Sequence, residues 1–76
     1  MIENEIHVGK MIQKKMEEEG RAVRWLAQKL SCNRSNIYKI YEKPNMDVKQ
    51  LLHISRILHH DFFMDISTLI LKDDNK

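Results

Sequence analysis

Basic side chains gather in one part of this 76-residue chain. Residues 21–43 hold six of its 13 lysines and arginines against a single acid, whereas the stretches before and after have a small excess of acids. The six are Arg21, Arg24, Lys29, Arg34, Lys39 and Lys43. Such a cluster is either an ordinary solvated face or a surface that attracts nucleic-acid phosphates. The three arginines favour the second interpretation, because they stand near expected helix N-termini, where positive charge is unfavourable unless a phosphate or base edge offsets it.

Two short helices joined by a tight turn must position these groups. The first has apolar residues at the spacing of one α-helical face. These residues are Val23, Leu26, Ala27 and Leu30. Residues 31–33 then interrupt the pattern. Asn33 is of a type that caps a following helix, by accepting a backbone N–H from Ser35 or Asn36.

The second helix separates an apolar face from a polar one. We expect it to bury Ile37, Ile40 and Tyr41. The opposite face carries Ser35, Tyr38, Lys39 and Glu42, with Arg34 at the open N-terminal end. A second helix with this polar and basic start is shaped to enter the major groove of DNA.

This helix pair resembles the helix-turn-helix of the Cro and phage-repressor (XRE-type) family. The residues that carry the resemblance are Leu26-Ala27, Ser31, Cys32 and Ile37. The family usually has glycine where this chain has Ser31, and a glycine at a turn often provides a positive φ. We therefore expect either strain at Ser31 or a slightly different turn. The resemblance extends from about Gly9 to Phe63, because the family places one helix before the motif and one or two after it.

The resemblance implies an all-α, lambda-repressor-like DNA-binding domain of four to five short helices, with the helix-turn-helix as helices 2 and 3. Three local signals support this arrangement. Gly9 inside the first helix indicates close contact with another helix. Pro44 ends the recognition helix, and Asp47 with Gln50 resembles a capping box at the start of the next one. We predict helices over residues 5–19, 22–30, 34–43 and 47–59, then a C-terminal helix or dimerisation segment over 60–71 and a frayed tail over 72–76. Residues 67–71 fit either helix or strand.

The same resemblance implies which side chains contact DNA. Base edges would be read by Arg34, Ser35, Tyr38 and Lys39. Phosphate-backbone contacts would come from Arg24, Asn33, Asn36 and Lys43. The implied function is that of a sequence-specific, double-stranded-DNA-binding transcriptional regulator, which acts as a homodimer on a pseudo-palindromic operator.

The C-terminal third is expected to form the dimer, because the helix over 47–59 is apolar around more than half of its circumference. The expected interface comprises Ile54, Ile57, Phe62, Phe63, Leu69, Ile70 and Leu71. Trp25 lies roughly opposite the apolar stripe of its own helix. Three interpretations are open: the segment around Phe62 and Phe63 covers this side chain, or Trp25 contacts a second subunit, or its indole N–H contacts a phosphate. Two alternative functions are a protein–protein interaction module on the same fold, and an antitoxin-type regulator with a protein partner.

Other classes of protein are disfavoured. The acidic N-terminal residues lack a signal-peptide pattern, and no apolar run approaches the length of a membrane span. Cys32 is the single cysteine, so it cannot form an internal disulfide, which fits a reducing cytoplasm, and we expect it to be buried. His53, His59, His60 and Asp61 lack partners for a metal site. We therefore expect no metal and no cofactor. With no phosphate-binding loop or catalytic triad, and little room for a pocket, the chain is not expected to be an enzyme.

Overall fold

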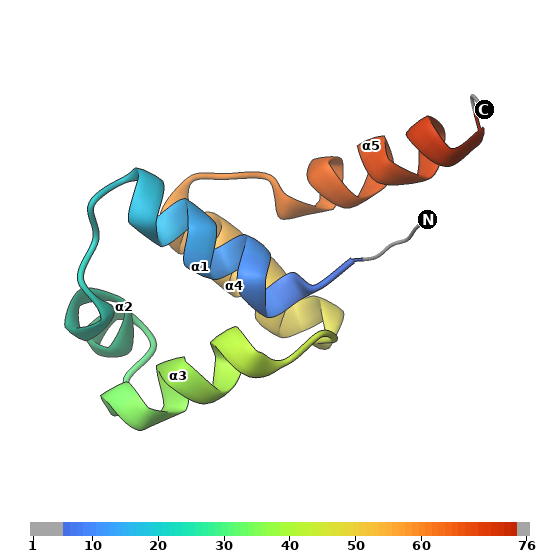
Figure 1. Cartoon of the computed structure of the whole chain (residues 1–76). Helices are drawn as coiled ribbons and strands as arrows, with labels where there is room; N and C mark the ends of the chain where they lie inside the picture. The colour runs from blue at the N-terminus through green and yellow to red at the C-terminus, as the bar shows by residue number, and fades with distance from the viewer. Residues whose placement is uncertain (1–5, 75–76) are drawn as a thin grey trace. The chain divides into compact units, whose positions relative to one another are not determined.

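The computed structural model describes the backbone of residues 6–74 and the side chains of residues 6–70. The regular secondary structure of this part of the chain is all α-helix, which confirms the expected all-α class. Its five helices are α1 (Val8–Glu18), α2 (Val23–Lys29), α3 (Arg34–Glu42), α4 (Val48–Leu58) and α5 (Phe62–Asp74). Figure 1 shows them in chain order. The chain divides into two compact units, Met1–Met46 and Asp47–Lys76.

Helix α1 begins later than the periodicity predicts. The sequence predicts that this helix begins at residue 5. Residue 5 lies outside the described residues, and residues 6 and 7 are not helical. His7 is the N-cap, and its ring Nδ1 accepts the backbone N–H of Lys10 at 3.1 Å. The helix ends at Glu18, and Gly20 follows it with a φ of 66°, the left-handed conformation typical of a residue after a helix.

The N-terminus of α1 rests on the end of α3. The backbone N–H groups of Val8 and Gly9 donate to the carbonyl oxygens of Pro44 and Lys43, at 3.1 and 2.9 Å. A Cβ on Gly9 would overlap the backbone carbonyl oxygens of Ile40 and Tyr41. The expected reason for this glycine, close contact with another helix, is therefore the observed one.

Helices α2 and α3 form the pair that the sequence predicts, and α3 contacts both α1 and α2 (Figure 1). Each helix of the pair is slightly shorter than expected, because 22, 30 and 43 are cap residues. Leu26 and Ala27 are buried, whereas Val23 and Leu30 are half-buried. The turn between the helices has Ser31 at a φ of 56°. The expected strain is therefore present, since this conformation disfavours residues with a Cβ.

Replacing Ser31 by glycine should stabilise the protein. The substitution removes the left-handed strain, and the greater freedom of glycine in the unfolded chain offsets part of the gain. We expect the free energy of unfolding to rise by about 0.5–1 kcal/mol in urea denaturation. Ser67→Gly is the matched control, because Ser67 is an exposed residue within α5 and glycine there should destabilise by a similar amount. Equal losses from both variants would contradict the assignment of strain to Ser31.

In the second unit, α4 buries one face rather than several. Asp47 caps it, with a carboxylate oxygen that accepts the backbone N–H of Gln50 at 2.8 Å. The buried side chains are Leu51, Ile54, Ser55 and Leu58. Val48 and Leu52 remain 68% and 42% exposed, so part of the wide apolar surface predicted for this helix is not covered by the described residues. The helix ends before His59, whose φ of 53° is also left-handed.

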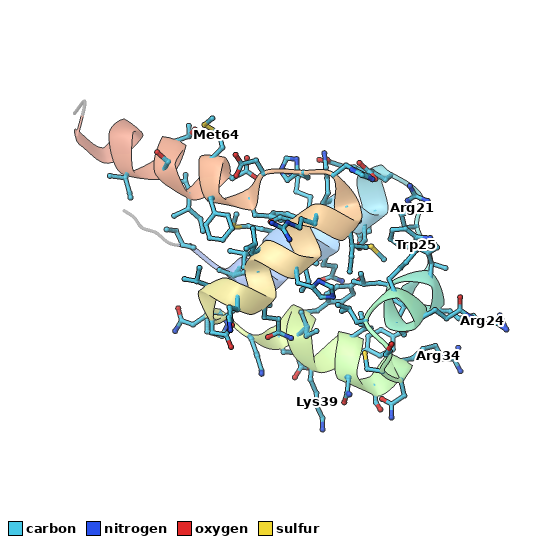
Figure 2. All side chains as sticks on the ribbon, turned by 180° about the vertical axis from the view of Figure 1, so that it is seen from behind. Arg21, Arg24, Trp25, Arg34, Lys39 and Met64 are labelled. Carbon is cyan, nitrogen blue, oxygen red and sulfur yellow. The ribbon has the colours of Figure 1, made fainter. Side chains whose placement is uncertain are left out.

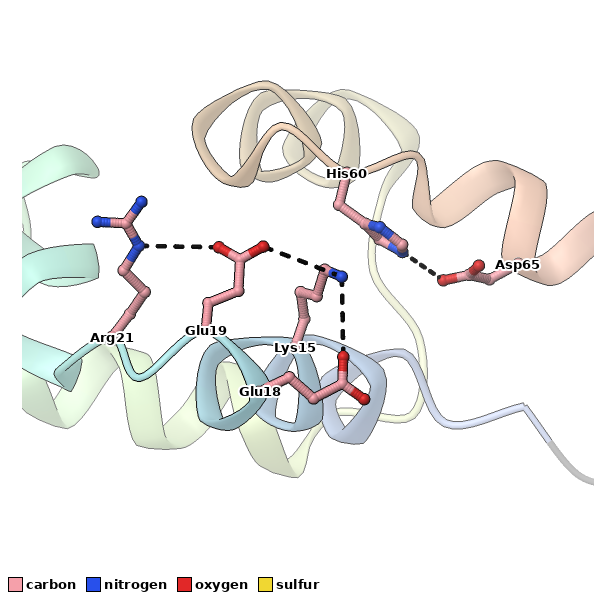
Figure 3. A network of polar contacts seen from close by, with 6 residues as sticks. All are labelled: Lys15, Glu18, Glu19, Arg21, His60 and Asp65. Carbon is pink, nitrogen blue, oxygen red and sulfur yellow. Dashed lines mark hydrogen bonds and ion pairs between the residues drawn. The ribbon is translucent and has the colours of Figure 1, made fainter.

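Helix α5 is longer and more regular than expected. Residues 67–71 are helical rather than extended, and the helix continues through 72–74, which the sequence predicts as a frayed tail. Asp61 accepts the backbone N–H of Met64 at 3.0 Å at its start. His60 and Asp65 then pair at 2.7 Å (Figure 3). No helix in the described part of the chain is long and apolar enough to span a membrane.

Candidate nucleic-acid interface

Helix α3 presents one polar face and buries the other, as the sequence predicts. Ile37, Ile40 and Tyr41 are buried. The four residues expected to read base edges, Arg34, Ser35, Tyr38 and Lys39, are all exposed. Because α1 and α2 both contact α3 within the first unit, this exposed face is fixed on a small helical scaffold.

The cap of α3 limits which polar groups are free to contact a ligand. Asn33 Oδ1 accepts both the backbone N–H of Asn36, at 3.1 Å, and the hydroxyl of Ser35, at 2.8 Å. Asn33 therefore offers only its amide N–H groups, and the hydroxyl oxygen of Ser35 remains able to accept. Asn36 is exposed, and its side chain is not part of this cap.

Most of the lysines and arginines of this unit make no ion pair with a described acidic side chain. The ion pairs between described side chains of this unit join Arg21 to Glu19 at 3.7 Å, and Lys15 to Glu18 and Glu19 at 3.7 and 3.9 Å (Figure 3). No ion pair with a described side chain involves the expected DNA-contacting cations Arg24, Arg34, Lys39 and Lys43. Figure 2 shows Arg24, Arg34 and Lys39 pointing outward from α2 and α3. The first turn of α3 contains no acid that would screen Arg34.

Trp25 contacts cations of its own segment. The guanidinium carbon of Arg21 lies 4.2 Å from the centroid of the Trp25 ring, and Lys29 Nζ lies 5.8 Å from it. Trp25 is half-buried. Sequence reasoning missed this arrangement; the spacing of four residues between Trp25 and Lys29 within α2 is a signal for one of the two contacts, whereas Arg21 lies before the helix. The three interpretations offered for Trp25 stay predictions: that Phe62 and Phe63 cover it, that it contacts a second subunit, and that it contacts a phosphate.

Tyr38 is held by its neighbour one turn further along the helix. The rings of Tyr38 and Tyr41 meet edge to face, with centroids 6.3 Å apart and planes at 84°. Burial of Tyr41, helped by the charges of Glu17 and Tyr38, raises the pKa of its phenol above the usual 10.0. Tyr41 therefore stays neutral at physiological pH. Both tyrosines border a hollow of about 360 Å³ between α1 and α3, with His7, Lys10, Gln13 and Glu42.

The expected dimerisation residues fall into different environments. Ile54 and Phe62 are 0% and 1% exposed, so their side chains belong to the core and offer no surface to a second subunit. Ile57 and Phe63 are half-buried, and Leu69 and Ile70 are exposed. The side chain of Leu71 lies outside the described residues. Val48, Leu52 and Met64, which the sequence prediction did not include, are 68%, 42% and 60% exposed.

Cys32 is more exposed than expected, and His60 has structural contacts. Cys32 is half-buried in the turn before α3 rather than fully buried. His60 pairs with Asp65 and meets the ring of Phe62 edge to face at 4.7 Å, which makes it a structural residue at the start of α5. Among the residues that the structure describes, no group of three or more histidines, cysteines or carboxylates is placed to hold a metal ion.

No protein-family model matches the chain, and no match was found among curated proteins or among solved structures. The resemblance to the helix-turn-helix family therefore rests on the residues of α2 and α3 themselves.

Proposed function

We propose that this protein binds double-stranded DNA in a sequence-specific manner and acts as a small transcriptional regulator in the cytoplasm. The observation that supports this proposal best is the exposed face of α3. Arg34, Tyr38 and Lys39 project from it, opposite the buried Ile37 and Ile40. The N-terminal end of α3 is basic, and its first turn contains no acidic residue. A helix of this kind, held on a small helical scaffold, has the shape and charge that major-groove recognition requires.

The contacts divide by their expected role. Arg34 carries a planar guanidinium that can bind the O6 and N7 atoms of guanine together, and the ring of Tyr38 can pack on a thymine methyl. Arg24 and Lys43 stand at the edges of this surface, where they would bind phosphates and fix the register of the protein on the duplex. The proposal includes a homodimer, because two recognition helices would read two half-sites about one helical turn apart.

A binding measurement with a random-sequence duplex tests the proposal. Fluorescence anisotropy at two salt concentrations should show binding that weakens steeply as salt increases. Selection of bound duplexes from a random pool should then yield a preferred site. Sedimentation at micromolar protein concentration measures whether the free and bound protein is a dimer. Absence of binding at low salt would contradict the proposed function.

Lys43→Gln should weaken binding to all duplexes by about the same factor. Lys43 is an exposed cation at the C-terminal edge of α3, so its expected partner is a phosphate rather than a base. The slope of the logarithm of the binding constant against the logarithm of salt concentration should decrease by about one unit. Lys49→Gln is the matched control, since Lys49 is an exposed cation on α4. An unchanged slope for Lys43→Gln would show that this residue does not contact DNA.

A second candidate is a protein-interaction module, which includes an antitoxin-type regulator with a protein partner. The exposed apolar residues of the second unit favour it, namely Val48, Leu52, Met64, Leu69 and Ile70. Exposed large apolar side chains in this number are more typical of a protein that binds a partner than of a domain that acts alone. The two candidates differ in the duplex-binding experiment, because a module that binds only protein would not show a salt-dependent affinity for DNA.

A further inference from the structure

The hollow between α1 and α3 opens beside the face of α3 that is proposed to read DNA. It has a volume of about 360 Å³. Its lining residues come from the first half of α1, with its cap, and from α3, and they are His7, Lys10, Gln13, Tyr38, Tyr41 and Glu42. Tyr38 belongs to both surfaces, because it lines the hollow and is one of the exposed residues expected to contact a base. A duplex bound to α3 would therefore pass the mouth of this hollow.

The α1 side of the hollow is rich in hydrogen-bond donors. The ring Nδ1 of His7 accepts the backbone N–H of Lys10 at 3.1 Å, so the neutral ring carries its proton on Nε2, which can donate. Lys10 is exposed, and its ammonium makes no ion pair with a described side chain. The amide of Gln13 adds further N–H groups. A phosphate, which combines negative charge with several acceptor oxygens, matches these donors.

The position of these donors indicates that the phosphate belongs to a duplex. A helix in the major groove lies between the two phosphate backbones that border the groove, which is about 12 Å wide. The phosphate contacts proposed above belong to α2, where Arg24 points outward (Figure 2), and to the ends of α3, and none belongs to α1. His7 and Lys10 lie beside Tyr38 and Glu42, which share one face of α3 at a spacing of four residues. They therefore border the later turns of the recognition helix.

We propose that His7 and Lys10 bind a phosphate of the bound duplex at the mouth of this hollow, which makes α1 a third helix of the DNA-binding surface. This inference rests on the proposed function. The ammonium of Lys10 supplies the charge, and Nε2–H of His7 donates to a phosphate oxygen. Contacts of this kind fix the register of the protein on the duplex without reading its sequence. Binding should therefore depend on Lys10 to the same extent on all duplexes.

Glu42 offers a different explanation for Lys10, which the experiment must separate. It is the one acid in the lining, and it is the exposed last residue of α3. A carboxylate at this position attracts Lys10 and repels a phosphate. Lys10 would then help DNA binding only by neutralising Glu42, without a contact of its own. The two explanations differ once Glu42 is removed, because a direct contact between Lys10 and a phosphate would remain.

Binding of the full chain to a random-sequence duplex, measured by fluorescence anisotropy at several salt concentrations, tests the inference. Lys10→Gln should weaken binding about three- to tenfold near about 0.1 M salt and reduce the salt slope by about one unit. Lys10→Arg should keep the slope. His7→Asn retains a residue that caps helices but removes the ring donor, and should weaken binding about two- to threefold. Lys14→Gln is the matched control, because Lys14 is an exposed cation of α1 that does not line the hollow.

The same measurement in a Glu42→Gln background separates the two explanations. Lys10→Gln should still reduce the salt slope there by about one unit. Loss of its effect in that background would overturn the inference, since Lys10 would then only neutralise Glu42. An equal decrease in slope for Lys14→Gln would overturn it too, because the effect would then be that of any charge on α1. Intact binding by the unmodified chain with an unchanged slope for Lys10→Gln would overturn the α1 contact alone, whereas absence of any duplex binding would contradict the proposed function itself.

Discussion

Gly9→Ala should destabilise the protein more than Gly20→Ala, the same substitution at the other glycine of the chain. The added Cβ would overlap the backbone carbonyl oxygens of Ile40 and Tyr41, which belong to α3 and cannot move without shifting the helix. The hydrogen bonds from Val8 and Gly9 to Pro44 and Lys43 hold the two segments at this distance. We expect a loss of about 3 kcal/mol in the free energy of unfolding, a large part of the stability of so small a domain.

Gly20→Ala separates this steric effect from the effect of backbone conformation. A Cβ on Gly20 would meet nothing within 4 Å, but its φ of +66° is unfavourable for alanine. We expect that variant to lose only about 1–2 kcal/mol. Urea denaturation monitored by circular dichroism measures both variants, with Lys14→Ala on the exposed side of α1 as a control that should change little. If Gly9→Ala lost no more than Gly20→Ala, the close contact between α1 and α3 would be wrong.

The local features of the helix pair could be predicted from the sequence because they depend on neighbouring residues. Asn33 and Asp47 cap α3 and α4 through side-chain oxygens that accept the N–H three residues later. Ser31 adopts the left-handed conformation expected of the residue that replaces a turn glycine. Gly9 indicated a close contact because glycine within a helix is otherwise unfavourable. Each of these inferences needed only a few residues and a known stereochemical preference.

The features that the sequence did not reveal depend on which apolar residues are covered. A helical wheel of α4 shows a wide apolar surface, but it does not distinguish the buried Ile54 from the exposed Val48 and Leu52. The same ambiguity placed Phe62, which is buried, in the expected dimer surface. Helix α5 continues through 72–74 although terminal polar residues usually indicate fraying.

The exposure of the candidate contact residues could be predicted from the sequence, but the local pairings of their neighbours could not. All four expected base contacts are exposed on α3 because the apolar periodicity of that helix fixes which side is buried. The stacking of Arg21 on Trp25 was not foreseen, and it matters for the electrostatics of the unit. Arg21 is held by Glu19 and by the ring, whereas Arg24 and Arg34 are not paired with any described acid. Both are therefore available to DNA, and Arg34 is the one expected to read a base because it stands at the N-terminal end of α3.

Arg34→Ala should separate specific from non-specific binding. The proposed contact of its guanidinium with a guanine predicts a loss of about 1–3 kcal/mol on the preferred duplex, and reduced discrimination at one base pair. Binding to random duplex should decrease much less. The folded protein should become slightly more stable, by about 0.3–1 kcal/mol, because the substitution removes an exposed cation from the N-terminus of α3.

Affinity measured on the selected site, on its single-base variants and on random duplex gives the comparison, and thermal unfolding of the same samples shows that the fold is retained. Arg24→Ala is the matched control, since Arg24 is an exposed arginine at the start of α2 whose expected partner is a phosphate. It should weaken all duplexes by a similar factor. If Arg34→Ala behaved in the same way, Arg34 would be a phosphate contact, and base readout would have to come from Tyr38 and Lys39. The opposite signs expected for DNA affinity and for stability make this variant informative, because simple unfolding would lower both.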